Sequence, residues 1–198
     1  MIGKKVVTGV VAFALTSALS AAVRPASPFK DGMVLQRDRK VPVWGKASAG
    51  EAVDVEFAGQ KLSAKADADG AWRVELSPMK ASKVARTMKI NDLEINDVLV
   101  GEVWLASGQS NMALPIWNSD PRVRDRNGAA VMQIVRHRNV RYANLLDWQT
   151  SETPQDEIAF KWREHRQSDV SRAWNGGQSA VAFYFAEQIG RASCRERV

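Results

Sequence analysis

The feature that most constrains the fold is a series of short segments with a period of two between residues 23 and 100. In residues 51–57, for example, Val53, Val55 and Phe57 share one face while Asp54 and Glu56 share the other. Turn-forming residues separate the segments, as in Asp67-Ala68-Asp69-Gly70. Short strands at this spacing, without a helical period, predict a small antiparallel β-sandwich over residues 23–100.

The strands that we expect in this region span residues 40–45, 51–57, 61–66, 71–76, 86–95 and 97–100. Pro42 interrupts the first of them, and we expect that strand at the edge of a sheet because proline cannot donate a backbone hydrogen bond. Trp72, Val74 and Leu76 are predicted to face inward. Stripes of tryptophan and valine are more often core than a platform for sugar binding.

The pattern changes at Gly101. Residues 103–106 form a compact apolar run that predicts a buried strand, and residues 178–188 have the amphipathic period of a helix that packs on a sheet. Residues 131–135 and 140–146 could be strands or short helices, and residues 151–157 indicate a loop. A strand, a tight turn and a later helix predict the start of an α/β domain over residues 101–188, which are too few to complete one.

The two ends of the chain are expected to lie outside the fold. Residues 1–22 have the charged, apolar and small-residue regions of a secretory signal peptide, so we expect a secreted or periplasmic protein; the alternative is an uncleaved membrane anchor. No later segment is apolar enough to span a membrane. Residues 189–198 (IGRASCRERV) resemble one reading frame of a sequencing adapter, so we expect a tail that is not native; the alternative is a genuine basic tail.

That interpretation of the tail has two consequences. Cys194, the only cysteine, would not be native, and the natural protein would continue past Gln188. A single cysteine also excludes a disulfide framework or a site with several thiolate ligands.

The net charge of +6 and the pI of about 9.7 resemble those of a nucleic-acid-binding protein. The predicted signal peptide and tail each contribute +2, which leaves an ordinary +2 for the rest. Six arginines gather in the middle of the chain, with Tyr142 as the aromatic residue near them, so we expect a solvated face and no nucleic-acid partner. An alternative is that one of them binds the carboxylate of an acidic sugar. The six are Arg122, Arg124, Arg126, Arg136, Arg138 and Arg141.

Ser110 is the candidate nucleophile. It lies in Ser107-Gly108-Gln109-Ser110-Asn111, directly after the predicted strand, where Gly108 permits a tight or strained backbone and the serine is lifted clear of the sheet. The backbone N–H of Ser110, with Gln109 and Asn111 nearby, could stabilise an oxyanion. Met112 replaces the last glycine of a Gly-x-Ser-x-Gly elbow, and the alternative is a loop composed of turn-forming residues.

The two histidines are weaker candidates. His137 and His165 are each flanked by charged residues that include arginine, which disfavours the protonated ring and makes a base role chemically possible. Both lie on polar segments, and we expect neither to be catalytic. Neither has a second ligand at suitable spacing, so we expect no metal site and no cofactor.

Three motifs together resemble the sialate O-acetylesterase family of the SGNH hydrolases. Residues 100–112 (VGEVWLASGQSNM) are similar to the family's first motif, residues 31–37 (DGMVLQR) and 41–45 (VPVWG) to its accessory β-domain, and residues 178–185 (QSAVAFYF) to a later helix. The resemblance covers residues 26–188. It implies a β-sandwich accessory domain followed by the incomplete start of a flavodoxin-like α/β hydrolase domain.

The resemblance also implies an esterase that removes O-acetyl groups from sialic acid or a related sugar, with Ser110 forming an acyl-enzyme. In the family a glycine and an asparagine complete the oxyanion hole and a late Asp-x-x-His motif supplies the base. None of these is matched here, so we expect this chain to be truncated and inactive. Ala113 follows Met112 where the family has an acidic residue, so the resemblance does not determine which sugar the esterase would accept. The alternatives are a non-catalytic carbohydrate-binding module or a general SGNH esterase or lipase.

Overall fold

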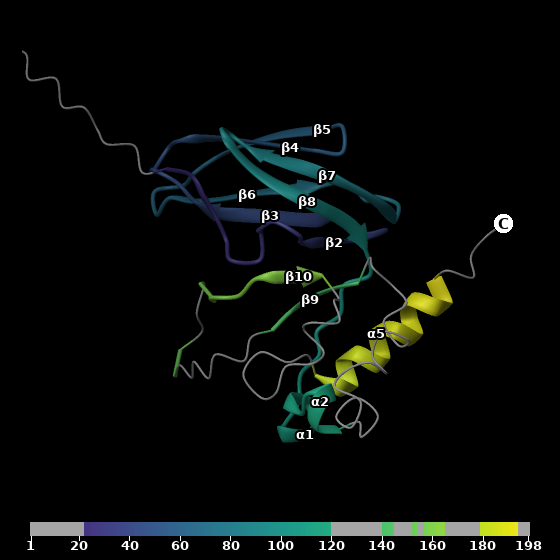
Figure 1. Cartoon of the computed structure of the whole chain (residues 1–198). Coiled ribbons are helices and arrows are strands. Elements are labelled where there is room, and N and C mark those ends of the chain that lie inside the picture. Colours follow the sequence, from purple (N-terminus) through teal and green to yellow (C-terminus); the bar gives the residue numbers. More distant parts are fainter. Residues whose placement is uncertain (1–21, 120–139, 145–151, 154–156, 165–178, 194–198) are drawn as a thin grey trace, which may run out of the picture.

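The computed structural model describes residues 22–119, 140–144, 152–153, 157–164 and 179–193. The fold is mostly β-sheet (Figure 1). A three-stranded sheet has the order β1-β3-β6, and a five-stranded sheet has the order β2-β8-β7-β4-β5. Their strands are β1 (Arg24–Pro25), β2 (Val34–Gln36), β3 (Val41–Lys46), β4 (Ala52–Phe57), β5 (Gln60–Lys65), β6 (Ala71–Leu76), β7 (Ser82–Ile90) and β8 (Leu93–Gly101).

The core lies between these two sheets, and it follows directly from the period of two. Val53, Val55 and Phe57 of β4 are at most 2% exposed, and the residues between them are not buried. Trp72 and Leu76 of the three-stranded sheet belong to the same buried cluster. The inward positions predicted for β4 and β6 are therefore confirmed, and burial of these side chains is the main term that stabilises the sheets.

One pair of strands departs from the predicted antiparallel arrangement. β2 pairs with β8 in parallel, with Val34 opposite Leu99 and Gln36 opposite Gly101. A parallel pair needs a long connection, and β3 to β7 all lie between these two strands in the sequence. The prediction of a wholly antiparallel sandwich is wrong at this edge.

The predicted edge position of Pro42 is also wrong in one respect, because β3 is the central strand of its sheet. β1 pairs only with Gly45 and Lys46, so it ends before it reaches Pro42. Ala26 N donates to Trp44 O (2.9 Å), which places the backbone groups of Trp44, and by alternation those of Pro42, on the β1 side. The side of β3 to which the Pro42 nitrogen points therefore has no neighbouring strand at that residue, and the missing N–H of proline costs no hydrogen bond between strands.

The predicted strand over residues 86–95 is in fact a hairpin. The chain reverses at Asn91, whose φ of 49° is in the left-handed region that asparagine tolerates. Asn91 is held by β4, since its N–H donates to Asp54 O (2.9 Å) and its Oδ1 accepts from Asp54 N (2.8 Å). β8 then continues through the residues predicted as a separate strand, 97–100.

The remaining described elements are α1 (Ser110–Ala113), α2 (Ile116–Ser119), β9 (Arg141–Ala143), β10 (Trp162–Glu164) and α5 (Ala180–Ser193). β9 and β10 form an antiparallel pair below the larger sheets, and α1 and α2 lie at the N-terminal end of α5 (Figure 1). The predicted helix is confirmed and is longer than expected. It continues past Gln188 to Ser193, into residues that we assigned to a non-native tail. Residues 131–135 lie outside the described part of the chain.

Arg141 connects the β9–β10 pair to the larger sheets. Its side chain is 6% exposed; its Nη2 atom donates to both carboxylate oxygens of Asp97 (2.8 and 2.9 Å), and Nη1 lies 3.0 Å from Glu164 Oε1. Trp162 Nε1 also donates to Pro28 O (2.9 Å). The expectation of a solvated face is wrong for Arg141, because Asp97 and Glu164 together compensate the cost of burying its charge.

None of the helices within the described residues is long and apolar enough to cross a membrane. The predicted signal peptide, apart from its last residue Ala22, lies outside the described part of the chain.

Candidate functional site

Ser110 begins α1 and is exposed to solvent. The predicted buried strand before it is not found: β8 ends at Gly101, and residues 102–108 have no regular secondary structure. Val103, Trp104 and Leu105 are 41%, 61% and 86% exposed. An apolar run becomes a buried strand only where other elements cover it, and no described strand pairs with this run.

The backbone around Ser110 makes a tight start to a helix. Gln109 precedes the helix in an extended conformation, and its carbonyl accepts hydrogen bonds from Met112 N (2.9 Å) and Ala113 N (3.3 Å). Of the tight or strained backbone that we expected Gly108 to permit, the structure has a tight turn, and Gly108 is not in the left-handed region. A Cβ atom at Gly108 would lie 3.0 Å from Met112 Cβ, so the glycine serves close packing of the turn instead.

The turn is attached to the N-terminal end of α5. Ala180 N donates to Leu114 O (2.9 Å), and the Ser179 hydroxyl contacts Met112 Sδ at 3.5 Å. Beneath these contacts, Ile116 and Phe183 are at most 1% exposed. The contacts made by Ser179 and Ala180 join the turn to α5, and Ser110 at the start of α1 stays exposed to solvent.

The exposed part of the turn offers several hydrogen-bond donors beside the hydroxyl. Gln109 and Asn111 are exposed on either side of Ser110. No described residue accepts a hydrogen bond from the backbone N–H of Ser110 or Asn111, as is usual for the first turn of a helix. Within the described residues, the turn therefore combines an exposed serine with two backbone N–H groups that have no acceptor, the type of donor that can stabilise an oxyanion.

Within the described residues, no side chain forms a hydrogen bond with Ser110 Oγ, and so none is placed to act as its base. His137 and His165 lie outside those residues, as do the arginines of the predicted cluster other than Arg141. The same part of the chain contains no group of three residues that could hold a metal ion. Two surface hollows in it lie on the β-sheets, one lined by Asp54 and Glu56 and one by Lys80 and Arg86.

Two contacts near the candidate site are not predictable from the sequence. Trp104 and Phe185 meet edge to face, with ring centroids 5.2 Å apart, so the exposed run before Ser110 contacts α5. Val103 N donates to Gln36 Oε1 (2.9 Å), which ties the same run to β2. No motif in the sequence signals either contact, because both depend on how distant segments pack.

Comparison with known proteins gives consistent similarities. No protein-family model matches the chain. Sialate O-acetylesterase of Homo sapiens is 30% identical over 183 residues, which cover 84% of this chain and 34% of the relative. The Mus musculus enzyme is 27% identical over 181 residues, with 84% and 33% covered. The crystal structure of a carbohydrate acetylesterase from Xanthomonas citri matches with a TM-score of 0.72 and 31% identity, over 86% of this chain and 38% of that one.

The chain thus spans about a third of the length of the curated relatives that it matches. The matched region includes most of the described residues, and the solved structure shares the fold as well as the sequence. The chain belongs to the sialate O-acetylesterase family.

Proposed function

We propose that this chain carries the nucleophile of an esterase that removes O-acetyl groups from sialic acid or a related sugar. The observation that supports this most is the exposed hydroxyl of Ser110 at the start of α1, in a chain similar to acetylesterases. The relatives' names supply the substrate class, and the geometry of the turn supplies the candidate nucleophile.

In the proposed reaction, Ser110 Oγ attacks the acetyl carbonyl carbon while a base takes its proton. The carbonyl oxygen becomes an oxyanion, which the N–H groups of Ser110 and Asn111 and the side-chain amides of Gln109 and Asn111 would stabilise. Collapse of this intermediate expels the sugar alcohol, which takes up the proton, and leaves Ser110 acetylated. Water then attacks the acetyl group and releases acetate.

The base is the missing part of this scheme. A serine hydroxyl is a weak nucleophile without one, and no described residue supplies it. We propose that the base comes from the part of the relatives' length that the printed sequence does not span, so that residues 1–198 alone turn over acetyl esters very slowly.

The exposed apolar run before Ser110 supports the same view. Trp104 and Leu105 are exposed, and Phe185, which meets the Trp104 ring, is itself 43% exposed. We propose that residues 101–188 begin an SGNH-type α/β domain in which further strands cover this run, and that residues 23–100 form its accessory β-sandwich domain. A signal peptide at residues 1–22 would send the protein to the periplasm or outside the cell.

The test uses a hybrid protein in which residues 22–188 continue into the C-terminal part of the Xanthomonas citri carbohydrate acetylesterase. Its hydrolysis of p-nitrophenyl acetate is compared with that of Ser110→Ala and of Ser107→Ala, a matched control in the same exposed turn. The proposal expects Ser110→Ala to reduce kcat by about a thousandfold or more and Ser107→Ala to leave it within about threefold. Equal activity of wild type and Ser110→Ala would refute the assignment.

An active hybrid also allows the sugar to be identified. Release of acetate from O-acetylated sialic acid and from acetylated xylan, measured at equal concentrations, compares an acidic with a neutral sugar. The proposal expects faster release from the sialic acid.

A further inference from the structure

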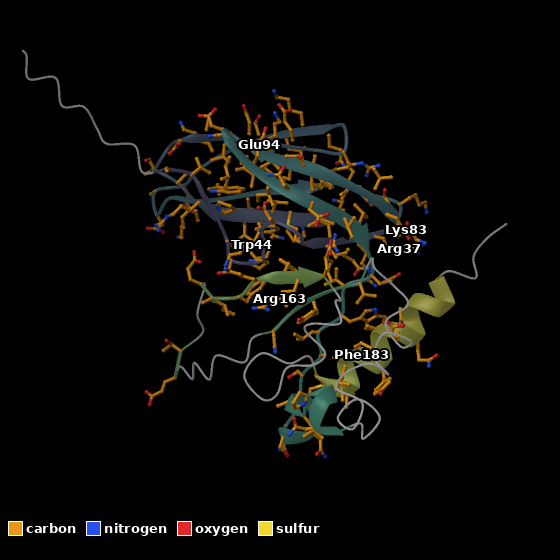
Figure 2. All side chains as sticks on the ribbon, viewed as in Figure 1. Arg37, Trp44, Lys83, Glu94, Arg163 and Phe183 are labelled. Atoms are coloured by element: carbon orange, nitrogen blue, oxygen red, sulfur yellow. The ribbon has the colours of Figure 1, made fainter. Side chains whose placement is uncertain are left out.

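The outer face of the three-stranded sheet carries an exposed tryptophan. Along β3, Val41 and Val43 are buried in the core, so by alternation Pro42, Trp44 and Lys46 lie on the opposite face. Trp44 is labelled in Figure 2. Trp44 is 39% exposed, in contrast to Trp72 on the neighbouring strand, which is 3% exposed. The expectation that the tryptophans of this region are core is therefore correct for Trp72 and wrong for Trp44.

The ring of Trp44 is held in place from one side. Phe29, which is 6% exposed, meets it edge to face with ring centroids 4.8 Å apart. Such a contact restricts the rotamers of an exposed indole, so a ligand that stacks on the ring loses less entropy on binding. A preformed aromatic surface of this kind suits the apolar face of a sugar ring.

A guanidinium without a hydrogen bond to any described residue lies beside that surface. Arg73 of β6 is directly opposite Trp44 in the sheet register. Trp44 O accepts a hydrogen bond from Ala26 N on the β1 side of the strand, so Trp44 and Arg73 form a non-hydrogen-bonded pair. In pairs of this type the side chains lie closer together. Arg73 makes no hydrogen bond or ion pair with another described residue, so its planar fork of donors is open to a carboxylate.

The charge of this face indicates which sugars it fits. Arg24, Lys46 and Arg73 all project from it, since Arg24 pairs with Lys46 in register. A carboxylate on the same face, Glu75, pairs with Lys40 at 2.8 Å and interacts more weakly, through charge alone, with Arg73. A face with excess positive charge around an exposed indole is complementary to a negatively charged ring.

We propose that Trp44 and Arg73 form an accessory binding site for a sugar that carries a carboxylate. The sugar ring stacks on Trp44, and the carboxylate accepts two hydrogen bonds from Arg73, with Lys46 and Arg24 adding to the positive potential. The site involves no residue of the Ser110 turn, so it stands whether or not that turn is catalytic.

The experiment titrates the full chain, by isothermal titration calorimetry, with the methyl α-glycoside of N-acetylneuraminic acid and with its methyl ester. The ester keeps the ring but removes the charge. We expect the acid to bind about tenfold more tightly than the ester, because a charge-assisted bidentate pair is lost in the ester. Arg73→Gln should weaken binding of the acid about tenfold and leave the ester unchanged, whereas Trp44→Ala should weaken both about tenfold or more.

Two matched controls locate the site. Arg86→Gln removes an exposed arginine from the other sheet, and Trp104→Ala removes an exposed tryptophan near Ser110; both should leave the affinity unchanged. Arg73→Gln keeps the test decisive even if Trp44→Ala impairs folding, because the Arg73 side chain is exposed and forms no hydrogen bond with a described residue.

Three results would overturn the proposal. The first is equal affinity for acid and ester, and the second is no binding of either up to roughly 10 mM probe, above the millimolar Kd expected for a single-sugar site. The third is loss of binding in Trp104→Ala but not in Trp44→Ala or Arg73→Gln, which would place the sugar at the Ser110 turn instead.

Discussion

Apolar side chains are buried in the two sheets and exposed in the segment that follows them. In β4, Val53 and Val55 are fully buried, whereas Leu105, only a few residues after β8, is 86% exposed. Both runs have strong strand character, so the difference lies in what surrounds them. Eight strands cover each other's inner faces in the first region, and no described strand pairs with the second. A strand pattern therefore states which residues can be buried, and the partner element decides whether they are.

The largest expected effect comes from shortening one apolar side chain in each region. Phe57→Ala should lower the free energy of unfolding by about 3–5 kcal/mol, because Phe57 is 2% exposed between the sheets. Leu105→Ala should change it by less than about 0.5 kcal/mol. Urea denaturation followed by circular dichroism measures both, and similar losses in the two variants would show that residues 103–105 are covered in solution.

Glycine substitutions extend the comparison to the backbone. Gly70 has a φ of +75°, and a Cβ atom there would lie 2.3 Å from Ala47 O, so Gly70→Ala should cost about 2 kcal/mol or more. Gly108 has an ordinary φ and would meet only the Met112 side chain, so Gly108→Ala should cost less than about 1 kcal/mol. A larger loss for Gly108→Ala in thermal unfolding would mean that the Ser110 turn is strained after all.

The attachment of β9 and β10 to the sheets gives an intermediate effect. Asp97→Asn removes one of the two carboxylates that compensate the buried Arg141, and should cost about 1–2 kcal/mol. This is less than for a fully buried pair, because Asp97 is 43% exposed and Glu164 remains. Amide exchange should become faster in residues 141–143.

Lys61→Gln is the matched control for that variant, because it breaks a pair of exposed side chains with Glu56. It should lower the free energy of unfolding much less than Asp97→Asn does, and it should leave exchange in residues 141–143 unchanged. Equal losses in the two variants would show that Arg141 contributes no more than a surface pair.

The sheets were largely predictable from the sequence. β4 and β6 appear where alternation predicts them, with the expected residues inside. The errors lie where the outcome depends on a partner. The chain turns at Asn91 because Asp54 of β4 forms hydrogen bonds with that residue. β2 runs parallel to β8, and β1 is too short to reach Pro42. Such pairings join residues far apart in the sequence, and alternation within one segment carries no information on them.

The candidate site was predictable to a smaller extent. The exposure of Ser110 is as predicted, since a turn of small polar residues rarely packs inside. The buried strand before it is not found, and the backbone at Gly108 makes a tight turn without a left-handed φ. The roles of Ser110, Gln109 and Asn111 remain predictions. Arg141 was expected on a solvated face because an arginine is usually exposed. The sequence around it does not indicate that Asp97 of β8 and Glu164 of β10 lie beside it in the fold.

The smallest expected effect concerns Arg37, which joins the two regions. It lies 2.6 Å from Asp38 and 3.7 Å from Glu102, the first residue after β8. Its hydrogen bond, followed by that from Lys80, lowers the pKa of Asp38. Arg37→Gln should therefore raise the pKa of Asp38 toward its ordinary value, and Lys80→Gln should raise it less.

Carbon-detected NMR titration of the Asp38 carboxyl measures this shift, with Lys65→Gln as a distant control. Because the pKa of Asp38 is lowered in the folded state, its contribution to stability is present above the ordinary pKa and is lost as the pH falls through the lowered one. A pKa that does not move in Arg37→Gln would show that the pair is not formed in solution.

The most direct test of the proposed chemistry is to trap the nucleophile. The hybrid protein is treated with a fluorophosphonate ester, which forms a stable bond with an activated serine, and the modified residue is located by peptide mass spectrometry. We expect the label on Ser110, no label on Ser107, and loss of p-nitrophenyl acetate hydrolysis in proportion to labelling. Full inhibition with Ser110 unmodified, or label on a serine outside the turn, would contradict the account.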